Sequence, residues 1–302
     1  MRYGDGMLAG LKWNHPFRID GGSPETLLSM VERYIFYHMQ HPLLLDLFAE
    51  STAALRARVN GDSALLMVDA DGKTIRIQRP LGPAGPAMFQ EEIRACYGRK
   101  GILAAGLAPD LAGRFATSHP TSLIPIEQYV EFSSLDRWDP VLCGSLYKTL
   151  RSALHSADRE GIEVDGYDAK KHGRDALKIF EDWNSRKPRT ATYWMPRVLE
   201  AGSSIPALIG VAARKNQILL GVTFAFVCGS YGYMLMAVTR ERHGRAQEAM
   251  DYELLNRLRA LGVRRLDWGV SDGGTVLAYK KKYGDIRREP ITTFWIPPSP
   301  SR

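Results

Sequence analysis

One segment, residues 262–284, constrains the fold of this chain more than any other. It predicts a buried strand, a glycine-rich turn and a short helix that ends in Tyr-Lys-Lys-Lys-Tyr-Gly at positions 279–284. Strands and helices that alternate in this way indicate an α/β domain with a mixed sheet. The elements expected around it are two apolar strands, an amphipathic helix and a last strand, at 217–227, 233–238, 246–261 and 290–296. The residues at 229–232 predict a hairpin turn between the first two strands.

The first part of the chain predicts elements of the same kinds. Ser23 before Pro24 has the character of a helix N-cap, and Asp71-Gly72 predicts a hairpin between two strands. Residues 43–59 predict one amphipathic helix or two short helices. The other elements expected here are strands at 64–69, 74–78, 101–106 and 123–132 and a short helix at 88–97.

A basic amphipathic helix is predicted over 146–160. Its apolar residues recur at helical spacing, and Lys148, Arg151 and Arg159 occupy the other face. Gly161 has the character of its C-cap. A short strand at 162–164 and helices at 169–186 and 195–201 are expected to follow.

Composition sets the class of protein. The chain has 302 residues, ordinary hydrophobic content and a net charge of +7. A basic surface favours anionic partners such as nucleic acid, anionic lipid or phosphorylated substrates. The three cysteines show neither metal-ligand spacing nor a disulfide framework. With no apolar run of membrane-spanning length and no signal-peptide core, we expect a cytoplasmic protein without membrane insertion.

The lysine-rich ending resembles a known signature. Tyr279-Lys280 and Tyr283-Gly284 are similar to the Phe-Lys-x-x-Phe-Gly motif of the FemABX-like branch of the GNAT acyltransferase superfamily, with Tyr for Phe. The run from Lys148 to Val164 also resembles FemABX proteins and the catalytic domain of phosphatidylglycerol lysyltransferases.

This resemblance implies an α/β fold of two tandem GNAT-like domains, each a mixed sheet flanked by helices. We expect an N-terminal domain over 1–165, which includes the bridging helix 146–160, and a C-terminal domain over 166–302. The implied activity is aminoacyl-tRNA-dependent transfer of an aminoacyl group to an amine of a small molecule, peptide or lipid. Aminoacyl-tRNA would then be a co-substrate and partner, and no cofactor is expected.

The resemblance also places candidate site residues. Lys280 would stabilise negative charge at the acceptor end of the tRNA or at the ester, and Asp267 would act as general base or orient the amine. Candidate contacts to substrate or donor are Arg240, Arg242, Arg245, Ser271, Tyr279, Lys282, Tyr283, Arg288, Lys148 and Arg151. A structural alternative exists for each, because lysines suit a helix C-terminus and Asp and Ser are common caps.

Two other functions remain open. Acyl-CoA enzymes of this superfamily use an Arg/Gln-x-x-Gly-x-Gly/Ala loop for the pyrophosphate, and residues 241–246 match it at Gly244 and Ala246. Glu241 stands where Arg or Gln is expected, which disfavours CoA without excluding it. The chain could also be a non-catalytic scaffold that binds RNA or anionic lipid. The seven histidines show no metal-ligand spacing, so no metal site is expected, and no Gly-x-Ser-x-Gly or P-loop motif occurs.

Overall fold

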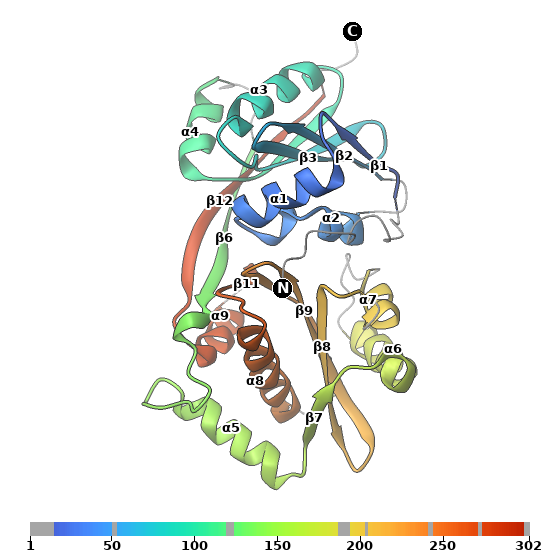
Figure 1. Ribbon diagram of the computed structural model, residues 1–302, viewed down its shortest axis with the longest axis vertical. Helices are drawn as coiled ribbons and strands as arrows, with labels where there is room; N and C mark the ends of the chain where they lie inside the picture. The colour runs from blue at the N-terminus through green and yellow to red at the C-terminus, as the bar shows by residue number, and fades with distance from the viewer. Residues whose placement is uncertain are drawn as a thin grey trace. The chain divides into compact units, whose positions relative to one another are not determined.

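The computed structural model describes residues 15–49, 53–118, 124–186, 194–202, 205–240, 244–270 and 274–298 (Figure 1). The chain forms two compact units. Unit 1 comprises Met1–Val130 and Arg288–Arg302, and unit 2 comprises Glu131–Arg287. The predicted domains, 1–165 and 166–302, therefore have other bounds than these two units.

The same order of elements occurs twice along the chain: strand, two helices, three strands, helix, strand, helix, strand. The first repeat consists of β1 (Phe17–Asp20), α1 (Pro24–Tyr34), α2 (Pro42–Phe48), β2 (Ala54–Asn60), β3 (Ser63–Asp69), β4 (Thr74–Gln78), α3 (Gly85–Cys96), β5 (Gly101–Leu107), α4 (Pro109–Ser118) and β6 (Ile124–Ser134). The second consists of β7 (Glu163–Gly166), α6 (Ala169–Arg186), α7 (Met195–Ala201), β8 (Leu208–Lys215), β9 (Ile218–Cys228), β10 (Tyr231–Thr239), α8 (Gly244–Ala260), β11 (Arg265–Val270), α9 (Gly274–Lys280) and β12 (Arg287–Ile296). Helix α5 (Lys148–Arg159) lies between the repeats in sequence.

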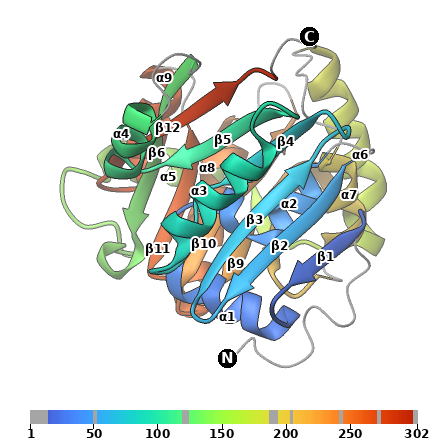
Figure 2. The same cartoon turned by 90° about the horizontal axis from the view of Figure 1, so that it is seen from above.

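In unit 1 the last strand comes from the second repeat. β12 pairs antiparallel with β5, and the strand order is β1-β2-β3-β4-β5-β12. Helix α3 covers one face of this sheet, and α1 and α2 lie on the other (Figure 2). Phe89, Phe115 and Phe294 pack edge to face or tilted in the core between α3, α4 and the sheet, so β12 is part of that core.

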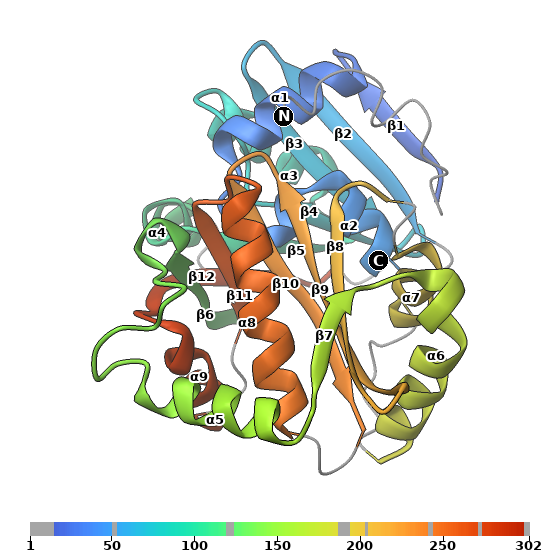
Figure 3. The same ribbon diagram turned by 60° about the horizontal axis from the view of Figure 1, so that its bottom comes forward.

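Unit 2 receives its last strand from the first repeat in the same way. The end of β6, from Glu131, lies beside β11, and the order continues β11-β10-β9-β8-β7. Helix α8 lies on one face of this sheet, and α6 and α7 lie on the other (Figure 3). Leu254, Leu255 and Leu258 of α8 and Leu150 of α5 are fully buried, which explains the amphipathic patterns of both helices.

Most expected elements are confirmed, but two predictions are wrong. Residues 43–59 do not continue as helix, because 54–60 form β2, in which buried and exposed side chains alternate with the period of a strand. The turn before β10 is also shorter than predicted, since Tyr231 already pairs with Cys228 in the strand. Ser23 caps α1 as expected by accepting a hydrogen bond from the Thr26 N–H.

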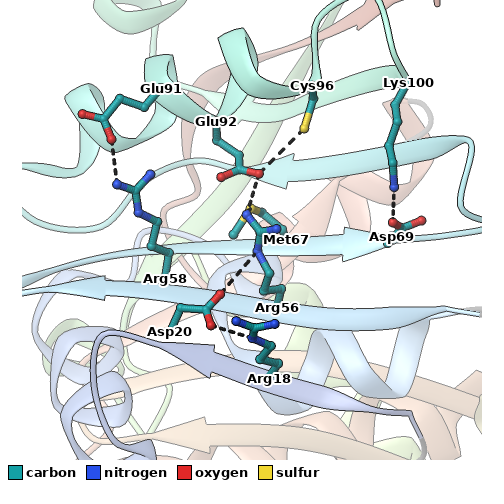
Figure 4. A network of polar contacts seen from close by, with 10 residues as sticks. All are labelled: Arg18, Asp20, Arg56, Arg58, Met67, Asp69, Glu91, Glu92, Cys96 and Lys100. Carbon is teal, nitrogen blue, oxygen red and sulfur yellow. Dashed lines mark hydrogen bonds and ion pairs between the residues drawn. The ribbon is translucent and has the colours of Figure 1, made fainter.

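An ion-pair network ties α3 to the outer strands of unit 1 (Figure 4). Arg56 on β2 donates to the buried Glu92 of α3 at 2.5 Å and lies 3.8 Å from Asp20 of β1. Arg58, two residues along the same strand face, donates to Glu91 at 2.7 Å. The network thus orients α3 across β2.

Gly106 should tolerate substitution less well than Gly72, although both glycines have a positive φ. It has φ +70°, and a Cβ there would overlap the Tyr37 hydroxyl, whereas Gly72 at φ +77° faces open space. Alanine at either position costs roughly 1–2 kcal/mol of backbone strain, and overpacking should add roughly 1–3 kcal/mol at position 106 alone. Urea unfolding of Gly106→Ala and Gly72→Ala measures the difference, and equal midpoints would contradict this packing.

Candidate functional site

The sheet of unit 2 opens between two parallel strands. β10 pairs with β11 at three positions, from Tyr231 to Tyr233, and then continues to Thr239 beside β9. A β-bulge between Met234 and Met236 accompanies the divergence. Within the described residues, the pairing of β10 with β11 stops after Tyr233. Beyond this point, that edge of β10 offers backbone groups that can bind an acyl carbonyl.

The corresponding strands of unit 1 stay closed. All five residues of β4, Thr74 to Gln78, pair with β5. The two repeats thus share the order of their elements, while the opening belongs to unit 2.

The backbone of one residue, Gly269 on β11, joins the two residues that were predicted to be catalytic. The Gly269 N–H donates to Asp267 Oδ1 at 2.6 Å, and its carbonyl accepts from Lys280 Nζ at 3.4 Å. Lys280 Nζ also lies 2.7 Å from Oε2 of Glu131, which is 0% exposed, and Tyr231 donates to Asp267 Oδ2 at 2.5 Å. Burial, with Asp267 next to it, raises the pKa of Tyr231 well above its usual value, so this hydroxyl remains a donor.

Unit 1 builds the same strand end without these polar groups. Gly106 has φ +70° and Gly269 has φ +71°, and each lies two residues after the residue that pairs with Ile77 or Tyr233. In unit 1 the place of Asp267 is taken by Ala104. Around Gly106 the hydrogen-bond partners are the neutral side chains of Thr293 and Tyr37. A lysine and carboxylates at this turn are therefore not a requirement of the fold, and buried ionisable groups of this kind mark candidate functional sites.

A second polar cluster connects α8 to α9 and to the 3₁₀ turn η4 (Lys281–Tyr283). Asp251 of α8 accepts from Gln247 Nε2 and from the Tyr279 hydroxyl, both at 2.7 Å, and the hydroxyls of Tyr279 and Tyr283 are 2.8 Å apart. Burial raises the pKa of Asp251 to about 6, although its hydrogen bonds act in the opposite direction. Burial and Asp251 together raise the pKa of Tyr279 far above its usual value.

Glu248, one helical turn before Asp251, is also buried. Its Oε1 lies 3.0 Å from Lys282 Nζ and 3.9 Å from Arg245. Lys282 also lies 4.8 Å from the centre of the Tyr279 ring. The predicted contacts Tyr279, Lys282 and Tyr283 are therefore brought together, against two carboxylates of α8.

The other predicted contacts do not join these clusters. Arg240 donates to the Leu219 carbonyl at 2.7 Å, and Arg151 holds the carbonyls of Leu142 and Gly144. Lys148 is exposed on α5, and Arg288, in unit 1, stacks on Tyr129 at 4.4 Å. Arg242 and Ser271 lie outside the described residues.

Sequence analysis missed five side chains of the two clusters: Glu131, Tyr231, Gln247, Glu248 and Asp251. Asp251 interrupts the apolar face of a predicted helix, and that signal could have identified it, whereas Glu131 falls on the polar face of its predicted strand. In the described residues, no group of three or more His, Cys, Asp or Glu side chains is arranged to hold a metal ion. None of the described helices is both long enough and apolar enough to cross a membrane.

The comparisons with known proteins concern the fold. No protein-family model and no curated protein matches the chain. Among solved structures, FemX matches with a TM-score of 0.69 and 12% identity, over 91% of this chain and 96% of that chain. The C-terminal domain of a putative lysylphosphatidylglycerol synthetase from Agrobacterium fabrum matches with a TM-score of 0.65 and 13% identity, over 90% of each chain. A tandem GNAT protein from the clavulanic acid biosynthesis pathway matches with a TM-score of 0.50 and 18% identity, over 91% of this chain and 94% of that chain.

The chain has the tandem GNAT fold. This confirms the predicted fold class, and the matches to FemX and to the synthetase domain confirm, as a likeness of fold, the resemblance to the FemABX-like branch. The opening between β10 and β11 lies in the second repeat of this fold.

Removal of Lys280 should destabilise this tandem GNAT protein, contrary to the small effect expected for an exposed lysine at a helix end. Lys280→Met leaves the Glu131 carboxylate buried without its ion pair, which costs about 3–5 kcal/mol. Lys280→Met combined with Glu131→Leu should recover most of that loss, because an apolar pair removes both charges. Urea unfolding of both variants measures the loss of stability and its recovery. A double variant as unstable as the single one would contradict the assignment of this ion pair.

Asp251→Asn should stabilise the protein at neutral pH. Asp251 has a pKa of about 6 against 3.8 for the free side chain, so the folded state loses stability as the pH rises from about 4 to 6. The full loss is about 3 kcal/mol, from about 1.4 kcal/mol per pKa unit. The advantage of Asp251→Asn should therefore grow between pH 4 and 6 and then stay constant in urea unfolding. A difference independent of pH would show that Asp251 has an ordinary pKa.

Proposed function

We propose that the protein is an N-acyltransferase that moves an aminoacyl group from aminoacyl-tRNA to an amine. The proposal rests on unit 2, where the open edge of β10 can bind a carbonyl and the adjacent helix α8 carries two buried carboxylates. The likeness of fold to FemX and to a lysylphosphatidylglycerol synthetase domain supports the same class of donor.

The position of the carboxylates is the observation that carries the choice of donor. A CoA pyrophosphate in this superfamily is bound where the loop meets the start of the helix that corresponds to α8, because backbone N–H groups and the helix dipole favour anions there. In this chain Glu248 and Asp251 lie in the first two turns of α8, and Tyr279 and Lys282 connect them to α9 and η4. Negative charge and these side-chain contacts at the helix start both disfavour a pyrophosphate.

The reaction needs little more than correct placement of two substrates. The ester carbonyl of the aminoacyl group would lie against backbone N–H groups of β10, which stabilise the oxyanion that forms when the amine attacks. Asp267 and Lys280 would fix the Gly269 peptide and so the direction in which β11 leaves β10. In this proposal both are positioning residues, and the basic surplus of the chain attracts the tRNA.

One feature keeps acyl-CoA as a second candidate donor. α8 begins at Gly244, and Arg245 is exposed in its first turn, so a cation is available at the helix start. The protein would then be an acyl-CoA-dependent transferase of the same superfamily.

Charged tRNA should bind in a strongly salt-dependent manner, and acetyl-CoA should not bind tightly. Neutralisation of several phosphates predicts an affinity that falls roughly tenfold or more between 50 and 200 mM salt. Filter binding with charged and uncharged tRNA pools, calorimetry with acetyl-CoA, and release of labelled amino acid in the presence of a primary amine together test the donor. Tight acetyl-CoA binding without any response to charged tRNA would refute the proposal, and tRNA binding without deacylation would favour the scaffold.

A further inference from the structure

The hydrogen-bond chain at Asp251 has a geometry suited to moving a proton. Asp251 is 2% exposed, and its two oxygens accept from Gln247 and from Tyr279 at 2.7 Å each. The Tyr279 hydroxyl continues the chain to Tyr283 at 2.8 Å. Tyr279, in the middle of this chain, is half-buried, whereas Asp251 and Tyr283 are buried, so Tyr279 is the member that a substrate can approach.

The groups that face Asp251 come from four elements. On α8 these are Gln247 and Glu248, on β9 Thr223, on α9 Tyr279, and on η4 Lys282 and Tyr283. The two cations of this region, Lys282 and Arg245, contact Glu248. Within the described residues, the side chains that hydrogen-bond to Asp251 are therefore neutral, and they lower its pKa without cancelling the effect of burial.

The first repeat offers an internal contrast. Its central helix α3 also carries a buried carboxylate, Glu92, but Arg56 holds that group in an ion pair at 2.5 Å (Figure 4). Asp251 of α8 instead has neutral donors, and a buried carboxylate of that kind can exchange a proton near neutral pH.

We propose that Asp251 and Tyr279, with Tyr283, form a proton relay that accepts the proton released by the attacking amine. This inference rests on the proposed function, which did not identify the base. The substrate side of the relay would take an ammonium group, which the carboxylates of α8 attract.

The attacking primary amine arrives as an ammonium ion, which has three N–H protons. One N–H proton passes to the Tyr279 oxygen while the Tyr279 hydroxyl proton passes to Asp251 Oδ2. The neutral nitrogen attacks the ester carbon, and the C–O bond to the tRNA ribose breaks. A second N–H proton goes to the ribose oxygen, and Asp251 finally releases its proton to solvent.

The properties of the two groups fit these roles. Asp251 has a pKa of about 6, so it is ionised at pH 7. A base is most efficient when its pKa lies near the pH of the reaction, as this pKa does. Burial and Asp251 raise the pKa of Tyr279, so this side chain carries its proton at rest and transfers it only as it receives another.

The test compares two amines with charged tRNA as donor. Ethanolamine is protonated at pH 7 and needs a base, whereas hydroxylamine is neutral and does not. Asp251→Asn and Tyr279→Phe should slow transfer to ethanolamine by roughly 10²–10⁴-fold and transfer to hydroxylamine by less than about tenfold, since only base catalysis is lost. Glu92→Gln, a carboxyl-to-amide change in unit 1, is the matched control and should leave both rates unchanged.

A second measurement does not depend on activity. In ¹³C NMR of the protein labelled at Asp carboxyl carbons, one resonance should titrate near pH 6, vanish in Asp251→Asn and shift in Tyr279→Phe. A carboxyl that titrates at the ordinary Asp value overturns the relay, as do variants that retain the full ethanolamine rate. A wild type that uses acetyl-CoA instead of charged tRNA refutes the proposed donor alone, and the same variants assayed with acetyl-CoA then decide the relay.

Discussion

The buried ion pair between Lys280 and Glu131 is the interaction on which the structure of unit 2 most depends. Two charges removed from water are unstable unless each finds its partner at short range, so the pair at 2.7 Å allows only one placement of α9 against the end of β6. Lys280 also reaches the Gly269 carbonyl, and Asp267 holds the N–H of the same residue. The ion pair thus determines where β11 ends.

The two repeats have used the same sequence of elements in different ways. Unit 1 keeps β4 and β5 paired along the whole of β4 and has Ala104 and neutral polar side chains such as Tyr37 at the strand end. Unit 2 separates β10 from β11 and places ionisable groups on both sides of the opening. Unit 1 thus completes the same strand end without a lysine–carboxylate pair, so the second copy is free to retain buried charges whose stability cost serves another purpose.

Sequence reasoning was strongest where local patterns decide structure. The helix over 169–186 and the lysine-rich ending were recognisable, because periodicity and caps act over a few residues. β8 was not expected, since its residues, Leu-Ile-Gly-Val-Ala-Ala-Arg-Lys, do not alternate between apolar and polar. Part of the candidate site was predicted, because Lys280 and Asp267 lie in a recognisable sequence motif. Glu131 was not predicted, because it lies 149 residues from Lys280 and no local pattern encodes a pairing over that distance.

The exchange of last strands sets an order for synthesis of the chain. Unit 2 is one continuous stretch, from Glu131 to Arg287, and all of its strands exist once that stretch has left the ribosome. Unit 1 still lacks β12 at that moment, and β5 retains an unpaired edge. The strands β1 to β5 of unit 1 are therefore made before unit 2, but unit 1 is completed after it, and until then the edge of β5 can pair with another molecule.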